Sequence, residues 1–160
     1  MQQILINKLH KYIRENNPDV LMQLEEDGMV TEYLSTKLGY VEDLINQVQN
    51  GQPSYIIENT CMDILTRDLR PSKYNYIRRI VDEEFEETNN QLIESGLLQF
   101  EVINMIAYCQ SVFDDLNFSE ENEENRFLRY AITGVIKEYL EEGRGENVKN
   151  GLQQSTKTEG

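Results

Sequence analysis

The sequence has few of the residues on which catalysis and metal binding usually depend. Its 160 residues include one histidine, two cysteines and no tryptophan. A typical zinc site and a di-metal helical bundle with two Glu-x-x-His pairs need more of these residues, and a Ser-His-Asp or Cys-His arrangement would depend on the single histidine. His10 has charged neighbours, which is typical of a surface residue, and no glycine-rich phosphate loop is present. We therefore predict a protein that is not an enzyme and has no metal or cofactor.

Basic residues and long apolar runs are also scarce. Fifteen basic against 29 acidic side chains give a net charge of −14, which opposes binding to phosphate backbones at long range. No apolar run approaches the roughly 18 residues that a membrane span requires, and the first residues do not resemble a signal peptide. Cys61 and Cys109 lie singly in apolar stretches, as buried free thiols do in a reducing compartment. These features predict a cytoplasmic protein without a membrane segment.

Apolar residues recur at helical spacing along most of the chain. No segment alternates with period two, so the pattern predicts an all-α protein, a multihelical bundle of six to seven helices. The best-delimited part is the hairpin of a helix from Ser54, a turn at 68–71 and a helix from Ser72, with both serines as predicted caps. We expect one domain over 1–144 and a disordered tail over 145–160, where apolar side chains are few.

Short motifs along the chain give it a resemblance to a known family. They are Tyr12–Glu15 running into Asn17–Asp19, Ser72–Tyr74 with Glu84–Phe85 downstream, and Thr133–Gly134 followed by Tyr139–Glu142. Over about residues 4–143 the chain resembles domain-of-unknown-function family eighteen ninety-six, small acidic proteins from Bacteroidetes. The family tends to have an aromatic residue at the position of Asp82, and a proline and a tyrosine within 123–125. The resemblance implies an all-helical fold, a bacterial cytoplasmic setting and frequent carriage on conjugative elements, and it supplies no catalytic residues.

The central hairpin carries the densest basic cluster of the sequence. Its candidate nucleic-acid contacts are Arg67, Arg70, Lys73, Tyr74, Arg78 and Arg79. A helix, a short turn and a basic second helix resemble the outline of a helix-turn-helix. The turn lacks glycine, however, and the acidic run 82–87 follows directly, so we favour a structural hairpin whose arginines pair with acidic neighbours. The acidic runs lack the ligand pattern of an EF-type calcium loop and indicate solvated surface.

The final helix has a broad apolar face. Its candidate interface residues are Ile132, Ile136, Tyr139 and Leu140. Such a face belongs either to the core, which is slightly favoured, or to an interface. Our first functional hypothesis is a helical accessory protein that acts by association with an unidentified protein partner. The alternatives are a nucleic-acid-linked regulator of a mobile element that uses the basic hairpin, and an acidic protein that mimics DNA.

Overall fold

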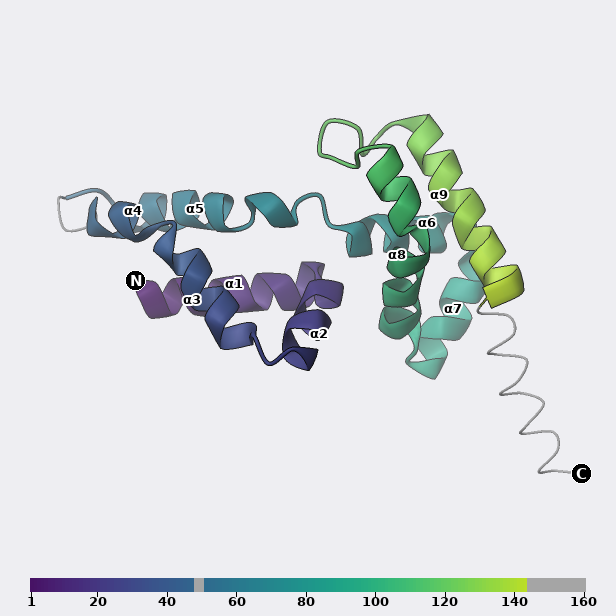
Figure 1. Cartoon of the computed structure of the whole chain (residues 1–160), viewed down its shortest axis with the longest axis horizontal. Coiled ribbons are helices and arrows are strands. Elements are labelled where there is room, and N and C mark those ends of the chain that lie inside the picture. Colours follow the sequence, from purple (N-terminus) through teal and green to yellow (C-terminus); the bar gives the residue numbers. More distant parts are fainter. Residues whose placement is uncertain (48–50, 144–160) are drawn as a thin grey trace, which may run out of the picture. The chain divides into compact units, whose positions relative to one another are not determined.

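A computed structural model describes residues 1–47 and 51–143 (Figure 1). The predicted all-α class is confirmed, because helices make up the described chain and no strand occurs within it. This chain divides into two compact units at Ser72 and Lys73. We call residues 1–72 the N-unit and the residues from Lys73 onward the C-unit. None of the described helices is long and apolar enough to cross a membrane.

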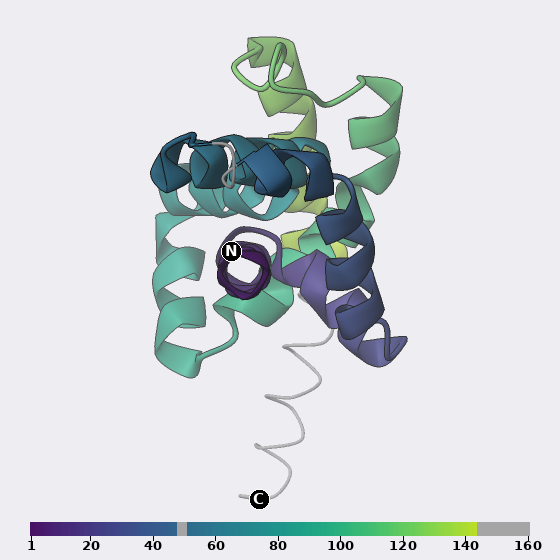
Figure 2. The same cartoon turned by 90° about the vertical axis from the view of Figure 1, so that its left-hand side faces the viewer.

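The N-unit contains five α-helices and a short 3-10 turn. Their bounds are α1 Gln2–Asn16, α2 Pro18–Glu26, α3 Val30–Gly39, α4 Glu42–Gln47, α5 Ser54–Leu65 and η2 Arg67–Leu69. Helix α1 runs beside α5 (Figure 1), and Figure 2 looks along α1 nearly end-on. On α1, Leu5, Leu9 and Ile13 follow one another at four-residue spacing and are all buried. This spacing places one stripe of α1 in a core of aliphatic residues and Cys61.

Polar side chains connect distant segments of the N-unit. Pro18 occupies the first turn of α2 as predicted, but the buried Asn17 makes no side-chain cap. Instead, the Asn17 amide donates a hydrogen bond of 3.1 Å to the Leu69 carbonyl. The Ser72 hydroxyl, predicted to cap the following helix, donates to the Asn16 carbonyl. These bonds join the α1–α2 junction to the end of the N-unit.

The apolar stripe from Val30 to Val48 does not form one helix. Helix α3 ends at Gly39, and α4 begins at Glu42 after a turn in which Val41 is completely buried. Glycine costs about 1 kcal/mol in a helix interior relative to alanine, and the buried Val41 side chain stabilises the turn. A similar break at Phe85 separates α6 from α7, so the described chain contains more helices than the six or seven predicted.

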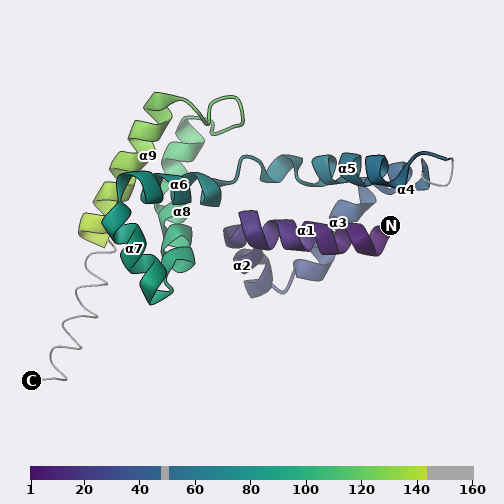
Figure 3. The same cartoon turned by 180° about the vertical axis from the view of Figure 1, so that it is seen from behind.

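The C-unit contains four α-helices followed by a π-helical turn. Their bounds are α6 Lys73–Glu84, α7 Glu86–Ser95, α8 Leu98–Asp115, α9 Arg126–Glu138 and η3 Tyr139–Gly143. Helix α8 packs against α6, α7 and α9, an arrangement that can be followed from behind in Figure 3. Gly96 ends α7 with φ +75°, a left-handed conformation that glycine adopts without steric cost. The tight turn there sends α8 back along α7.

Aromatic rings form part of the C-unit core. Phe113 is buried and lies 4.7 Å from the Phe118 ring and 6.0 Å from the Tyr76 ring, measured between centroids. The loop that follows α8 is held by Asn122, whose amide donates to the Leu116 and Asn117 carbonyls. The cap of α9 is Asn125, whose side chain accepts a hydrogen bond from the Leu128 amide at 3.0 Å.

The candidate interface residues of the final helix lie in or against the core of the C-unit, the interpretation that was slightly favoured. Ile132 and Ile136 are completely buried and Tyr139 is nearly so, and all three belong to the C-unit core, against which Leu140 packs. Tyr139 also donates a 2.5 Å hydrogen bond to the buried carboxylate of Glu101. These side chains stabilise the unit itself, because α9 presents its apolar stripe to α8.

The two predicted domain ranges, 1–144 and 145–160, both stay predictions. Residues 145–160, expected as a disordered tail, lie outside the described residues. The single domain expected over 1–144 stays a prediction. The two units have separate cores, but cooperative unfolding, which defines a domain thermodynamically, is a separate property.

Candidate functional site

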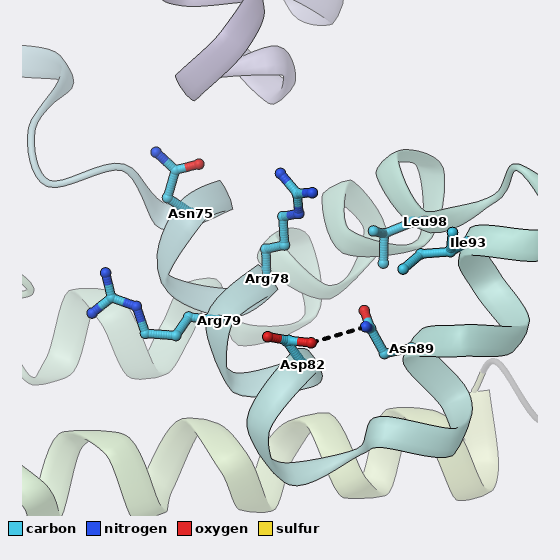
Figure 4. A pocket seen from close by; sticks show the side chains of 7 residues that line it. All are labelled: Asn75, Arg78, Arg79, Asp82, Asn89, Ile93 and Leu98. Carbon is cyan, nitrogen blue, oxygen red and sulfur yellow. Dashed lines mark hydrogen bonds between the residues drawn. The ribbon is translucent and has the colours of Figure 1, made fainter.

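An open pocket of about 360 Å³ lies on the C-unit and is the candidate site (Figure 4). Helices α6, α7 and α8 contribute its walls. The lining residues are Asn75, Arg78, Arg79, Asp82, Asn89, Ile93 and Leu98. One wall is polar and comes mainly from α6, and the other is apolar and comes from the α7–α8 turn. A ligand that fits both walls must carry a polar group and an apolar group side by side.

The polar wall follows from the amphipathic pattern of α6. Tyr74, Ile77 and Val81 are buried in the C-unit core at three- and four-residue spacing. Asn75, Arg78 and Asp82, also three and four residues apart, therefore share a face that solvent reaches. The core packing of α6 thus determines where these polar side chains lie.

A hydrogen bond between two helices shapes the floor of the pocket. The amide Nδ2 of Asn89 on α7 donates to Oδ1 of Asp82 on α6 at 3.1 Å (Figure 4). Asn89 is buried, so this bond satisfies a polar group that would otherwise lose its hydration without compensation. The bond holds the first turns of α7 against the end of α6. It also occupies one oxygen of the carboxylate nearest to Arg78.

Arg78 provides the cationic group of the pocket. Its guanidinium extends between Asn75 and the pair Ile93 and Leu98, whereas Arg79 points to the other side of α6 (Figure 4). Arg78 is exposed, and no ion-pair partner lies beside it among the described residues. Burial raises the pKa of Tyr74, and the positive charge of Arg78 opposes this rise. Arg78 is therefore a solvated cation at the edge of a hollow.

The acidic end of α6 is neutralised from another direction. Arg129 on α9 donates to Glu83 at 2.8 Å and to Glu84 at 3.1 Å. Because these two carboxylates have a cation of their own, they compete less for Arg78 or for a ligand cation. Arg79 lies 4.0 Å from Glu124, but both side chains are largely exposed and the pair contributes little.

The apolar wall is unusually exposed for its composition. Ile93 is 55% exposed and lines the pocket together with Leu98. Leu97 and Phe100, next to them in the chain, are also exposed. Exposed apolar side chains near one turn provide surface that a partner side chain can cover. A guanidinium beside such a surface can hold a carboxylate in a two-pronged hydrogen bond while the surface takes an aliphatic or aromatic group.

The predicted nucleic-acid residues are divided between the two units and differ in their local surroundings. Arg67 and Arg70 belong to the N-unit and both pair with Asp63, at 3.7 Å and 2.9 Å. In the C-unit, the Lys73 ammonium donates to Gln110 at 3.3 Å and lies over the Phe113 ring, and Tyr74 is buried. Of the six, Arg78 and Arg79 remain as exposed residues of the pocket. The pairing of Arg67 and Arg70 agrees with the hairpin interpretation that we favoured.

Sequence reasoning missed the other half of the site. Asn89 and Ile93 lie in a segment whose helical pattern is weak and ends at Gly96, and Leu98 belongs to the strongly helical pattern that follows. Their contribution depends on α7 folding back beside α6. The residue that could have indicated this wall was Ile93. It is apolar and follows the buried Leu92, and one apolar stripe of a helix cannot bury both neighbours. Within the described residues, no group of three or more histidine, cysteine, aspartate or glutamate side chains is placed to hold a metal ion.

The fold and the pocket define an all-α protein of two helical units with a small open site on the second. The model of the family described as "Domain of unknown function (DUF1896)" matches residues 5–144, so the chain belongs to this family. No match was found among curated proteins or solved structures. The family resemblance of the sequence motifs is thereby confirmed. The Bacteroidetes origin, the conjugative-element setting and the cytoplasmic location stay predictions.

Proposed function

We propose that this protein is a non-enzymatic accessory protein that binds a partner protein through the pocket of the C-unit. The partner contributes a short segment in which an acidic side chain lies close to a leucine, isoleucine or aromatic residue. The observation that carries the proposal is the exposed Arg78 guanidinium beside an apolar wall made by the exposed Ile93 and the partly buried Leu98. The carboxylate pairs with Arg78, and the apolar side chain covers Ile93.

The size and polarity of the pocket support a peptide. A volume of about 360 Å³ is at the lower end of the range of ligand sites, and it accommodates two or three side chains. An ion pair with the exposed Arg78 contributes about 0–1 kcal/mol, and covering the exposed part of Ile93 adds about 1 kcal/mol. The two contacts together provide the modest affinity typical of short linear segments.

The charges support a carboxylate rather than a nucleic acid. From Lys73 to the end of the sequence there are nine basic and 18 acidic side chains, so the C-unit is acidic as a whole. Nucleic-acid binding draws its affinity from several phosphate contacts made together. Arg78 and Arg79 point to different sides of α6 and offer no such row (Figure 4). The regulator and DNA-mimic hypotheses stay predictions without further support from the site.

The proposal can be tested with a displayed library of random peptides selected on the full-length protein. We expect enriched peptides that combine Asp or Glu with Leu, Ile or Phe within about one helical turn. The best of them should then be synthesised and their affinities measured by fluorescence polarisation. Arg78→Glu and Ile93→Asp should each weaken binding by at least about tenfold, because each removes one of the two contacts.

Matched controls come from the N-unit. Arg14→Glu makes the same change of charge on an exposed arginine, and Ile4→Asp makes the same change on an exposed isoleucine. Both controls should bind like the wild type. Enriched peptides whose affinity is insensitive to Arg78→Glu and Ile93→Asp would overturn the proposal. So would tight binding of a 20-base-pair DNA duplex that falls steeply between about 50 and 200 mM salt and is lost in Arg78→Glu.

A further inference from the structure

The solvent-facing side of α9 is a second feature that the core does not use. Leu128, Ile132 and Ile136 face inward, whereas Phe127 and Tyr130 are 69% and 70% exposed. Phe127, Tyr130, Gly134, Lys137 and Glu141 follow one another at spacings of three and four residues. This spacing repeats along one side of a helix and is the spacing of helix–helix seams. An aromatic pair therefore begins a seam that no described helix of the C-unit covers.

Gly134 lies at the centre of this seam. A Cβ atom added there would meet no heavy atom within 4 Å, and the residue has an ordinary helical conformation. Neither crowding within the unit nor a positive φ requires glycine at this position. A glycine in the middle of a helix is unfavourable by itself. The absence of a side chain does, however, allow a second backbone to approach α9 closely at this point.

The charges along the seam are arranged for self-pairing. Arg126 lies at the start of α9 and is exposed, while Glu138, Glu141 and Glu142 are exposed at its far end. If two copies of α9 cross in opposite directions at Gly134, Arg126 of each copy meets Glu142 of the other. In the same pairing Tyr130 meets Glu138, whose carboxylate can accept a hydrogen bond from the phenol. A parallel pairing would instead place like charges together.

We propose that this protein forms a twofold-symmetric dimer through antiparallel contact of two α9 helices, with Gly134 at the axis. A twofold interface must be complementary to itself, and a seam that is basic at one end, small at its centre and acidic at the other meets this condition. At physiological ionic strength the Debye length is about 8 Å, so the overall negative charge is largely screened while contacts across the seam are not. The interface does not involve the peptide pocket.

Sedimentation velocity of the full-length protein over a concentration series tests the dimer. Phe127 and Tyr130 from two copies bury a limited area, so we expect a dissociation constant in roughly the micromolar range. Tyr130→Asp should weaken the dimer at least about tenfold. Arg126→Glu and Glu142→Arg should each weaken it by about three- to tenfold, because every change breaks two symmetric pairs.

The charge-reversed double variant distinguishes this interface from a general effect of charge. Arg126→Glu combined with Glu142→Arg restores both pairs and should return the dissociation constant to within about twofold of the wild type. Gly134→Leu should abolish the dimer while leaving the helical circular dichroism spectrum intact. Arg14→Glu in the N-unit is the control and should have no effect. A protein that is monomeric at millimolar concentration, or a dimer that the double variant does not rescue, would overturn the proposal.

Discussion

The two units of this protein are of similar size but differ in how they use their polar side chains. In the N-unit, cationic side chains form ion pairs within the unit. Lys37 pairs with Asp68, and Arg70 pairs with Asp63. In the C-unit Arg129 pairs with two glutamates, while Arg78 is left to solvent beside an apolar wall. Paired charges stabilise a scaffold, whereas an unpaired cation next to exposed apolar surface is suited to binding. The difference places the candidate functions on the C-unit.

The cores differ as well. The buried hydrophobic cluster of the N-unit is aliphatic apart from Cys61, whereas that of the C-unit includes Phe113, Tyr74 and Tyr139. Each core contains one free cysteine, Cys61 in the N-unit and Cys109 in the C-unit, and both are completely buried. Burial raises the pKa of both thiols, that of Cys109 to about 12. Because the thiolate is the reactive form, each cysteine reports when its own unit opens.

The largest expected effect is on the aromatic core. Phe113→Ala should destabilise the C-unit by about 3–5 kcal/mol, because it removes a buried ring and leaves a cavity. Urea denaturation measures the loss. Labelling with a thiol reagent then shows which unit has lost stability. Cys109 should react at least about 100-fold faster than in the wild type, while the labelling rate of Cys61 stays unchanged.

Leu9→Ala in the N-unit is the matched variant for this comparison. It should accelerate the labelling of Cys61 and leave Cys109 unchanged, since Leu9 packs in the N-unit core. If each substitution accelerates both cysteines equally, the units unfold together. That result would remove the energetic distinction between them and would support the single domain predicted over residues 1–144.

The second expected effect concerns alkaline pH. The unfolded Cys109 thiol ionises near its ordinary pKa of 9.0, whereas the folded thiol stays protonated up to a pKa of about 12. Stability from this group is thus present below pH 9 and is lost as the pH rises above it. Between pH 8 and 10.5 the wild type should lose about 2 kcal/mol more than Cys109→Ala. Urea denaturation at both pH values measures the difference, and parallel losses in the two proteins would contradict it.

The third effect tests the polar connection of the N-unit. Asn17→Ala removes the buried hydrogen bond to the Leu69 carbonyl and leaves that oxygen unsatisfied, which should cost about 1–3 kcal/mol. Thermal denaturation measures the change, and faster labelling of Cys61 would assign it to the N-unit. Asn59→Ala is the control, because Asn59 is exposed on α5, and it should stay within about 0.5 kcal/mol of the wild type.

The smallest expected effect is a change in the stability of the monomer, and it has opposite signs at two glycines of the C-unit. Gly134→Ala should stabilise the monomer by up to about 1 kcal/mol, because alanine favours the helix and its Cβ meets nothing. Gly96→Ala should destabilise it by about 1 kcal/mol, because φ is +75° there. Urea denaturation at low micromolar concentration isolates the monomer. Destabilisation by Gly134→Ala would show that the glycine serves the fold of the unit itself.

Local patterns in the sequence predicted most of the fold. Apolar residues at helical spacing indicated α1, α8 and α9, and Pro18 marked the start of α2. The break at Gly39 was not predicted, because the burial of Val41 depends on neighbours distant in the sequence. The same limit applies to the site: Arg78 and Arg79 were among the candidate residues, but Asn89, Ile93 and Leu98 join them only when α7 folds back.

By itself the sequence determined the helical class, the acidic charge and the family, because each depends on residue types and their local spacing. The tertiary structure decided which apolar faces are covered. Ile132 and Ile136 became core because α8 lies against them, while Phe127 and Tyr130 on the same helix stayed exposed. The tertiary structure also assigned Arg67 and Arg70 to one compact unit and Arg78 to the other, since the division between the units falls at Ser72. Burial is a property of how helices pack together, and local spacing fixes only the side of each helix that can be buried.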